Sequence, residues 1–102
     1  MITHLVFFKM QPEADGHTGA ENARILVEKL KDLPASIPEL VKLEAGLDFS
    51  RSPASYEVGL MTQFKSRDDL EAYRVHPEHR KVIEFVQKTT SDRAVVDFES
   101  QG

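Results

Sequence analysis

Hydrophobic residues recur along the chain with two different periods, and these periods predict an alternation of strands and helices. Residues 2–9 are rich in β-branched and aromatic side chains, and a period of two places His4, Val6 and Phe8 on one face of an expected strand. The opposite face of this strand is largely apolar as well, so we expect both of its faces to be covered. Helices should form one cover, and a second subunit is the expected source of the other.

A helical period follows the first strand. Residues 11–17 contain a proline and an Asp-Gly pair and predict a loop, and Thr18 followed by Glu21 is a capping-box signature for a helix start. Pro34 ends this helix, and residues 37–40 are expected to form a short helical turn. The apolar stripe that should lie on the sheet consists of Ala23, Leu26, Val27, Leu30 and Leu33.

Two further strands are predicted in the middle of the chain. Residues 41–49 carry apolar side chains at every second position, which indicates the second strand. Residues 50–55 are polar and include a proline, so they predict a connection. Residues 56–64 alternate again and predict the third strand.

The last third of the chain predicts two helices, separated at a proline, and a final strand. Ser66 with Asp69 repeats the helix-start pattern and opens a short helix that carries Tyr73. Pro77 is tolerated at a first helical position and therefore opens a second helix. Residues 94–98 predict the final strand. The second helix carries an apolar stripe at His79, Val82, Ile83 and Val86.

The predicted order β-α-β-β-α-β belongs to the α+β class and corresponds to a ferredoxin-like sandwich, with an antiparallel sheet and its helices on one face. A length of 102 residues accommodates one domain, residues 1–102. The other face of the sheet is then bare, although its side chains are apolar. Burial of that face against a second copy is the simplest solution, so we predict a homodimer.

The composition limits the cellular compartments and the kinds of partner that we expect for this protein. The chain is 40% hydrophobic and 29% charged, and it has no apolar run of membrane-spanning length. Its N-terminus lacks the pattern of a secretory signal, so we expect a cytoplasmic protein without a membrane partner. The net charge is −4 and the basic residues are scattered, which argues against nucleic acid as a partner. The chain has no cysteine, which excludes disulfides, thiolate nucleophiles and cysteine-based metal sites.

Candidate chemistry is concentrated in residues 72–79, where Tyr73, His76 and His79 surround a proline. Histidine changes charge near neutral pH, so a tyrosine beside a pair of histidines can hold and move a proton. We expect Tyr73 and His79 to be catalytic candidates; the alternatives are a core aromatic and a histidine that caps a helix or bonds a carbonyl. His76 precedes a proline and is biased towards an extended backbone, so it fixes the turn or contributes to substrate binding.

His4 shares its strand face with apolar residues. An imidazole buried there needs a hydrogen-bond partner, either a water, a carbonyl or a ligand, so we expect His4 to line a cavity and to bind substrate. We expect no metal and no cofactor: His76 and His79 are three residues apart, but no carboxylate cluster accompanies them, and no phosphate-binding loop or dinucleotide motif is present. Cations held by backbone carbonyls leave no signature in a sequence.

Several short motifs resemble one known family in their order and spacing. The most specific are the histidine of the first strand and the His-Pro-x-His motif at residues 76–79. On these residues the chain resembles the Dabb family, the stress-responsive dimeric α/β-barrel domain, over almost its whole length. The resembling fragments are His4-Leu5-Val6, Phe8-Lys9, Ile37-Pro38, Gly46-Leu47-Asp48, Tyr56-Glu57-Val58-Gly59-Leu60, Phe64-Lys65-Ser66 and Ala72-Tyr73-Arg74-Val75-His76-Pro77-Glu78-His79.

The resemblance implies a ferredoxin-like protomer whose sheet pairs with that of a partner to form a barrel. Most members of the family have no assigned role or a loose link to stress response, and one plant member resembles a cyclase that closes a linear polyketide by aldol condensation. The catalytic Tyr and His of that cyclase correspond to Tyr73 and His79, and its cavity histidine on the first strand corresponds to His4. Two other polar cavity groups of the cyclase are replaced here by Val58 and Leu30, which argues against the same substrate and reaction.

Three functional interpretations follow. The first is a Dabb protein of unassigned role whose His- and Tyr-lined apolar cavity holds a small hydrophobic or phenolic ligand. The second is a cofactor-independent enzyme of the aldol type, in which His79 takes a proton next to a carbonyl, Tyr73 donates one to the developing oxyanion and His4 orients the substrate. The third, a protein similar to the dimeric-barrel monooxygenases, rests on fold analogy.

Overall fold

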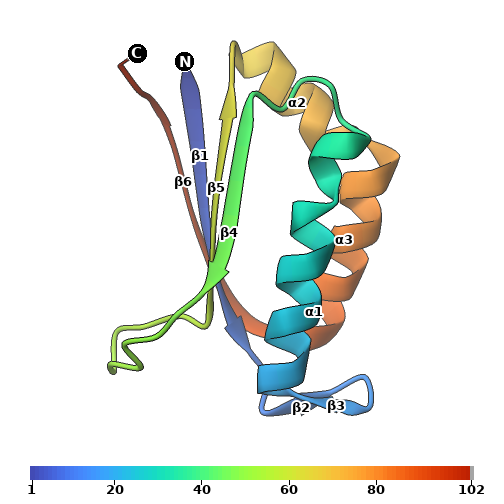
Figure 1. Ribbon diagram of the computed structural model, residues 1–102, viewed down its shortest axis with the longest axis vertical. Helices are drawn as coiled ribbons and strands as arrows, with labels where there is room; N and C mark the ends of the chain where they lie inside the picture. Colours follow the sequence, from blue (N-terminus) through green and yellow to red (C-terminus); the bar gives the residue numbers. More distant parts are fainter. Residues whose placement is uncertain (102) are drawn as a thin grey trace.

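The computed structural model describes residues 1–101 as a four-stranded antiparallel sheet with helices against one of its faces (Figure 1). The strands lie in the order β4-β5-β1-β6, so the first and last strands of the chain are neighbours. This arrangement confirms the predicted ferredoxin-like α+β fold. The elements are β1 (Ile2–Met10), α1 (Gly19–Lys31), a 3-10 turn η1 (Leu33–Ala35), β4 (Lys42–Leu47), β5 (Val58–Phe64), α2 (Arg67–Val75), α3 (Pro77–Thr89) and β6 (Thr90–Glu99).

The predicted helix starts are confirmed by their caps. The Thr18 hydroxyl accepts a hydrogen bond from the Glu21 backbone N–H at 3.2 Å, and the Glu21 carboxylate accepts one from the Thr18 N–H at 2.9 Å. The Ser66 hydroxyl accepts a hydrogen bond from the Asp69 N–H and starts α2, and Pro77 occupies the first position of α3. Local sequence thus sets where each helix begins.

The prediction of a plain loop at residues 11–17 is wrong in one respect. Residues 11–17 include most of a small hairpin of β2 (Glu13–Ala14) and β3 (His17–Thr18), with Asp15 and Gly16 at positive φ of 52° and 79° in its turn. An Asp-Gly pair favours this tight turn because both of its central residues need a left-handed backbone. The buried Asn22 of α1 donates a side-chain hydrogen bond to the Ala14 carbonyl at 2.9 Å and holds the hairpin on the helix.

The strand boundaries differ from the prediction. The second and third strands are shorter than residues 41–49 and 56–64, and the final strand is much longer than residues 94–98. It begins directly after α3 and pairs with β1 along its whole length, from Ile2 opposite Glu99 to Met10 opposite Thr90. Backbone pairing with a long neighbour includes polar residues that an apolar pattern cannot identify.

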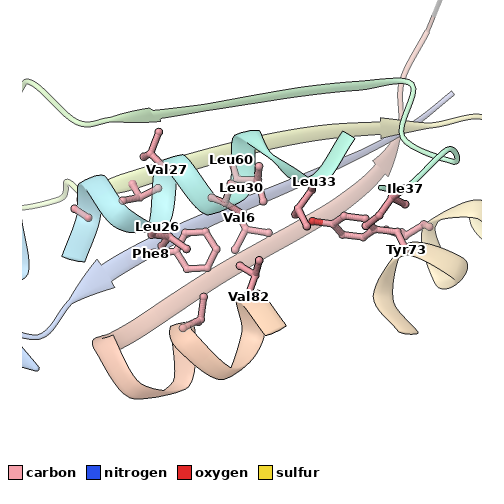
Figure 2. Packing of buried hydrophobic residues seen from close by; sticks show 14 of the residues in the cluster. Val6, Phe8, Leu26, Val27, Leu30, Leu33, Ile37, Leu60, Tyr73 and Val82 are labelled. Carbon is pink, nitrogen blue, oxygen red and sulfur yellow. The ribbon is translucent and has the colours of Figure 1, made fainter. Parts of the chain in front are cut away.

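The core lies between the sheet and the helices (Figure 2). The predicted stripe of α1 is buried, and Val6 and Phe8 of β1 face it. Tyr73 reaches into the same layer from α2. This packing fixes the distance between the helices and the inner face of the sheet, where His4 also lies.

No helix of the described residues 1–101 covers the outer face of the sheet (Figure 1). Phe7, Val96 and Phe98 on this face are 38%, 52% and 44% exposed. A hollow of about 620 Å³ lies on the same face beside β4 and β5, and the β4–β5 connection, which carries the 94% exposed Phe49, extends towards this side. The expected bare apolar face is therefore present, which is typical of a surface that a protein partner covers.

Among residues 1–101, no helix has both the length and the apolar character that a membrane crossing requires.

Candidate functional site

A second and smaller cavity, of about 280 Å³, lies between the inner face of the sheet and the helices. It contains the three residues that the sequence singled out on different elements: His4 on β1, Tyr73 on α2 and His79 on α3. The remaining wall is largely apolar. The other lining residues are Val6, Phe8, Leu30, Leu60, Arg74, Val82, Ile83, Val86, Arg93 and Val95.

Tyr73 and His79 lie against each other, with ring centroids 4.2 Å apart and an angle of 43° between the ring planes. The break between the two helices creates this contact. His76 has an extended backbone, with φ −63° and ψ 135°, and α3 restarts at Pro77. The proline thus turns the chain so that side chains on two successive helices meet in one cavity.

The phenol of Tyr73 is fully buried, and its ring also packs against Phe64 at 5.1 Å. Its hydroxyl has no hydrogen-bond partner among residues 1–101. Burial strongly raises the pKa of Tyr73, so the hydroxyl stays protonated at neutral pH. A neutral phenol in this position can donate a hydrogen bond to an acceptor on a bound ligand.

The imidazole of His79 is held through Nδ1, which lies 3.1 Å from the Arg74 carbonyl oxygen. Because a carbonyl only accepts, Nδ1 carries the proton, and Nε2 of the neutral ring keeps its lone pair. Burial lowers the pKa of His79, whereas the hydrogen bond to the Arg74 carbonyl acts in the opposite direction; the neighbouring His4, Arg74 and Arg93 lower this pKa further. His79 is therefore neutral at pH 7 and has a basic nitrogen available.

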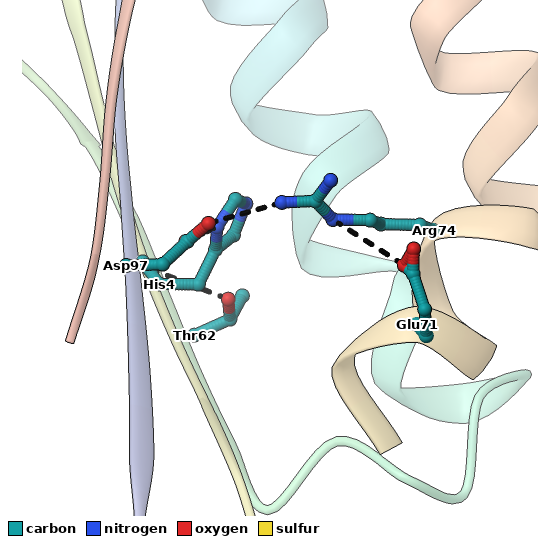
Figure 3. A network of polar contacts seen from close by, with 5 residues as sticks. All are labelled: His4, Thr62, Glu71, Arg74 and Asp97. Carbon is teal, nitrogen blue, oxygen red and sulfur yellow. Dashed lines mark hydrogen bonds and ion pairs between the residues drawn. The ribbon is translucent and has the colours of Figure 1, made fainter. Parts of the chain in front are cut away.

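The third group, His4, is 7% exposed and is held by a carboxylate (Figure 3). Its Nδ1 is hydrogen-bonded to Oδ1 of Asp97, and Oδ2 of Asp97 accepts a hydrogen bond from the Arg74 guanidinium at 3.0 Å. Arg74 also lies 4.0 Å from the carboxylate of Glu71. The Asp97 carboxylate fixes the His4 ring, whose centroid lies 6.2 Å from that of Tyr73 in an edge-on arrangement.

His76, the fourth predicted site residue, is not among the residues that line this cavity. Its Nδ1 accepts a hydrogen bond from the Glu78 backbone N–H at 3.1 Å and caps the start of α3. This contact matches the alternative in which His76 fixes the turn. Its role in substrate binding stays a prediction.

The sequence analysis did not identify three charged residues that lie at or beside the cavity: Arg74, Arg93 and Asp97. The inward face of β6 could have revealed two of them, because antiparallel pairing with β1 places Asp97 opposite His4 and Arg93 opposite Phe8. That register depends on a contact between the two ends of the chain. Among residues 1–101, no group of three His, Asp or Glu side chains has an arrangement that could hold a metal ion.

Comparison with solved structures shows the same fold in several proteins. A dimeric protein of unknown function from Bacteroides fragilis is 28% identical, with 97% of this chain and 95% of that chain covered and a TM-score of 0.85. A dimeric ferredoxin-like protein of unknown function from Thermobifida fusca is also 28% identical, with 95% and 88% covered and a TM-score of 0.80. The hydroxynitrile lyase of Passiflora edulis is 14% identical, with 95% and 90% covered and a TM-score of 0.79.

No functionally curated protein matches this chain in sequence. The family model described as Stress responsive A/B Barrel Domain matches residues 2–100, which is nearly the whole chain. Together with the ferredoxin-like fold and its helix-free sheet face, this match shows that the chain belongs to the Dabb family.

Proposed function

We propose that this chain is a homodimeric Dabb protein whose inner cavity binds a small carbonyl compound and catalyses proton transfer without a cofactor. The observation that carries the proposal is the pairing of a fully buried phenol, whose hydroxyl has no hydrogen-bond partner among residues 1–101, with a neutral imidazole whose ring centroid is 4.2 Å away. A buried hydroxyl without a partner costs about 1–3 kcal/mol, so folding alone gives little reason to keep it. A ligand oxygen would satisfy it.

In this mechanism Nε2 of His79 takes a proton from the carbon next to a carbonyl. The electron pair of the broken C–H bond moves to the carbonyl oxygen and forms an enolate. A base that is neutral at pH 7 and held through its other nitrogen has the required protonation state. Return of the proton, or attack of the enolate on an electrophile, completes the reaction.

Tyr73 acts on the oxygen at which negative charge develops. Because burial raises the pKa of Tyr73, the phenol is a poor source of a transferred proton and a good hydrogen-bond donor. This differs from the expectation that Tyr73 gives up its proton. His4, fixed by Asp97, would orient the substrate from the sheet side.

Two further features support the class of reaction. The hydroxynitrile lyase with the same fold is only 14% identical to this chain, so it supports the suitability of the fold for small-molecule chemistry and no more. Leu30 lines the cavity here, which favours an apolar substrate body. The monooxygenase alternative stays a prediction that rests on the shared fold.

The direct test measures hydrogen–deuterium exchange at the carbon next to the carbonyl of 4-phenylbutan-2-one in D₂O by NMR. The wild type should accelerate exchange over buffer, and His79→Gln should lower the protein-dependent rate by about 10²-fold or more. His17→Gln is the matched control, because His17 lies exposed on the β2–β3 hairpin.

A wild-type exchange rate equal to that of buffer, or an undiminished rate in His79→Gln, would contradict the enzyme hypothesis. Saturable binding of the ketone without exchange would instead support the non-catalytic binding module. Circular dichroism of each variant separates a lost base from a lost fold.

The homodimer is part of the proposal and has its own support. The proteins from Bacteroides fragilis and Thermobifida fusca are described as dimeric, and the uncovered apolar face of the sheet is a suitable surface for a second copy. A cytoplasmic location stays a prediction from the sequence.

A further inference from the structure

Among residues 1–101, the ionisable side chains that line the inner cavity include arginine and histidine but no acid. Among the described lining residues there is no Asp or Glu, whereas Arg74, Arg93, His4 and His79 are all present. The rest of the wall consists of aliphatic and aromatic side chains. A wall of this composition suits an apolar molecule that ends in an anionic group.

The two arginines differ in what already neutralises them. Arg74 donates to Asp97 at 3.0 Å and lies 4.0 Å from Glu71, so its charge is largely compensated. Within residues 1–101, no carboxylate oxygen lies within 4.0 Å of the Arg93 guanidinium. The hydrogen bond from Arg93 to the Asp92 carboxylate comes from the backbone N–H of Arg93 and leaves the guanidinium free of it. Arg93 therefore presents an uncompensated cation at the cavity.

The position of Arg93 follows from the strand register. Arg93 lies opposite Phe8, and two residues further along β6 Val95 lies opposite Val6. Alternation along a strand places both on the face that carries His4, which is the face of the cavity. Arg93 is exposed and also lines the cavity, so it lies at the rim, where the cavity meets solvent on the β6 side.

Arg93 and His79 line the same cavity, so a charge at one affects the protonation of the other. The charge of Arg93 is among the causes that lower the pKa of His79. A cation at the rim and a basic nitrogen inside therefore belong to one electrostatic environment, in which an anion bound at Arg93 would raise the pKa of His79.

We propose that the ligand of this cavity is a small, mainly apolar carboxylic acid whose carboxylate pairs with Arg93. The planar guanidinium offers two parallel N–H donors that match a carboxylate. The catalytic part of this inference rests on the proposed function. In that case the substrate is an oxo acid with its carbonyl towards Tyr73 and its carboxylate at the rim. The volume of about 280 Å³ limits the apolar body to a small one.

The test compares two ligands of nearly equal shape, benzoate and benzamide, by titration followed through the imidazole NMR signals of the intact protein at neutral pH. Benzoate should bind about tenfold more tightly than benzamide and raise the pKa of His79, whereas benzamide should leave that pKa unchanged. Arg93→Gln should remove the difference in affinity and leave benzamide binding as it was. Arg80→Gln is the matched control, because Arg80 is an exposed arginine of α3 that does not line the cavity.

Equal affinities in the wild type, the absence of saturable benzoate binding, or preference for benzoate that persists in Arg93→Gln would each overturn the inference. The readout is binding, so it is independent of the exchange assay. A protein that binds benzoate through Arg93 but exchanges no ketone hydrogen refutes the proposed catalysis and keeps the carboxylate site.

Discussion

The ring of Tyr73 lies 4.2 Å from the ring of His79, although the two residues belong to different helices. In one continuous helix, residues six positions apart are turned by roughly 120° from each other and cannot stack. The interruption at His76 and Pro77 removes this restriction, since α2 ends before it and α3 starts anew. A helix break that sequence reasoning treats as a boundary is thus the feature that assembles the candidate site.

The hydroxyl of Tyr73 should contribute nothing favourable to folding. Because it is buried without a partner among the described residues, Tyr73→Phe should raise the free energy of unfolding by about 1 kcal/mol while it lowers exchange activity. Urea unfolding at one fixed protein concentration measures this change. Tyr56→Phe is the control, since the exposed Tyr56 hydroxyl donates to Asp92 at 3.3 Å and its loss should matter little. A clear loss of stability in Tyr73→Phe would mean that the hydroxyl is satisfied in solution.

His79 should make stability depend on pH below neutrality. Its pKa in the folded protein lies below the ordinary value of 6.5, so the unfolded chain binds the proton more readily. The contribution of neutral His79 is complete above about pH 6.5 and declines as the pH falls from there towards the lower folded pKa.

Urea unfolding of the wild type and His79→Gln at about pH 7.5 and pH 5.5 measures this effect. The wild type should lose more stability than the variant between the two conditions. His17→Gln should behave as the wild type does, because His17 is exposed. Identical pH dependence in the wild type and His79→Gln would refute the expected linkage.

Asp97 should stabilise the sheet side of the cavity. It bonds the buried His4 ring and the Arg74 guanidinium at once, so Asp97→Asn should cost about 1–2 kcal/mol of unfolding free energy. Because the Asp97 side chain is 31% exposed, solvent screening keeps the loss below that of a fully buried pair. Thermal and urea unfolding measure the loss, with Asp92→Asn on the same strand as the control. A loss no greater than that of the control would show that the network does not stabilise the fold.

The outer face of the sheet should mediate dimerisation. Phe98 is 44% exposed there, and Phe98→Lys would force a charge against an apolar partner surface. Sedimentation equilibrium should give the mass of two chains for the wild type and a dissociation constant at least about tenfold higher for the variant. Val75→Lys, on the exposed side of α2, should leave the mass unchanged. A wild type with the mass of one chain at micromolar concentration would refute the dimer.

The sequence by itself determined the features that depend on residues near one another in the chain. The helix starts at Thr18, Ser66 and Pro77 follow from short-range hydrogen bonds and backbone restrictions, and the stripe of α1 follows from helical spacing. Tyr73 and His79 were candidates because they flank one proline. Each of these inferences needs only a few consecutive residues, which is why the helix starts and the stripe agree with the structure, whereas the catalytic role of Tyr73 and His79 stays a prediction.

Only the tertiary structure decided the rest. The length of β6 and the contact of His4 with Asp97 come from pairing between strands at opposite ends of the chain, whose register no local pattern contains. The same pairing brings Arg93 to the cavity, and the packing of helices on the sheet leaves the Tyr73 hydroxyl without a hydrogen-bond partner in the described part of the chain. The chemical role of a charge or an unsatisfied group depends on what lies beside it in space, and the buried His4 obtains its partner from Asp97, 93 positions away in the chain.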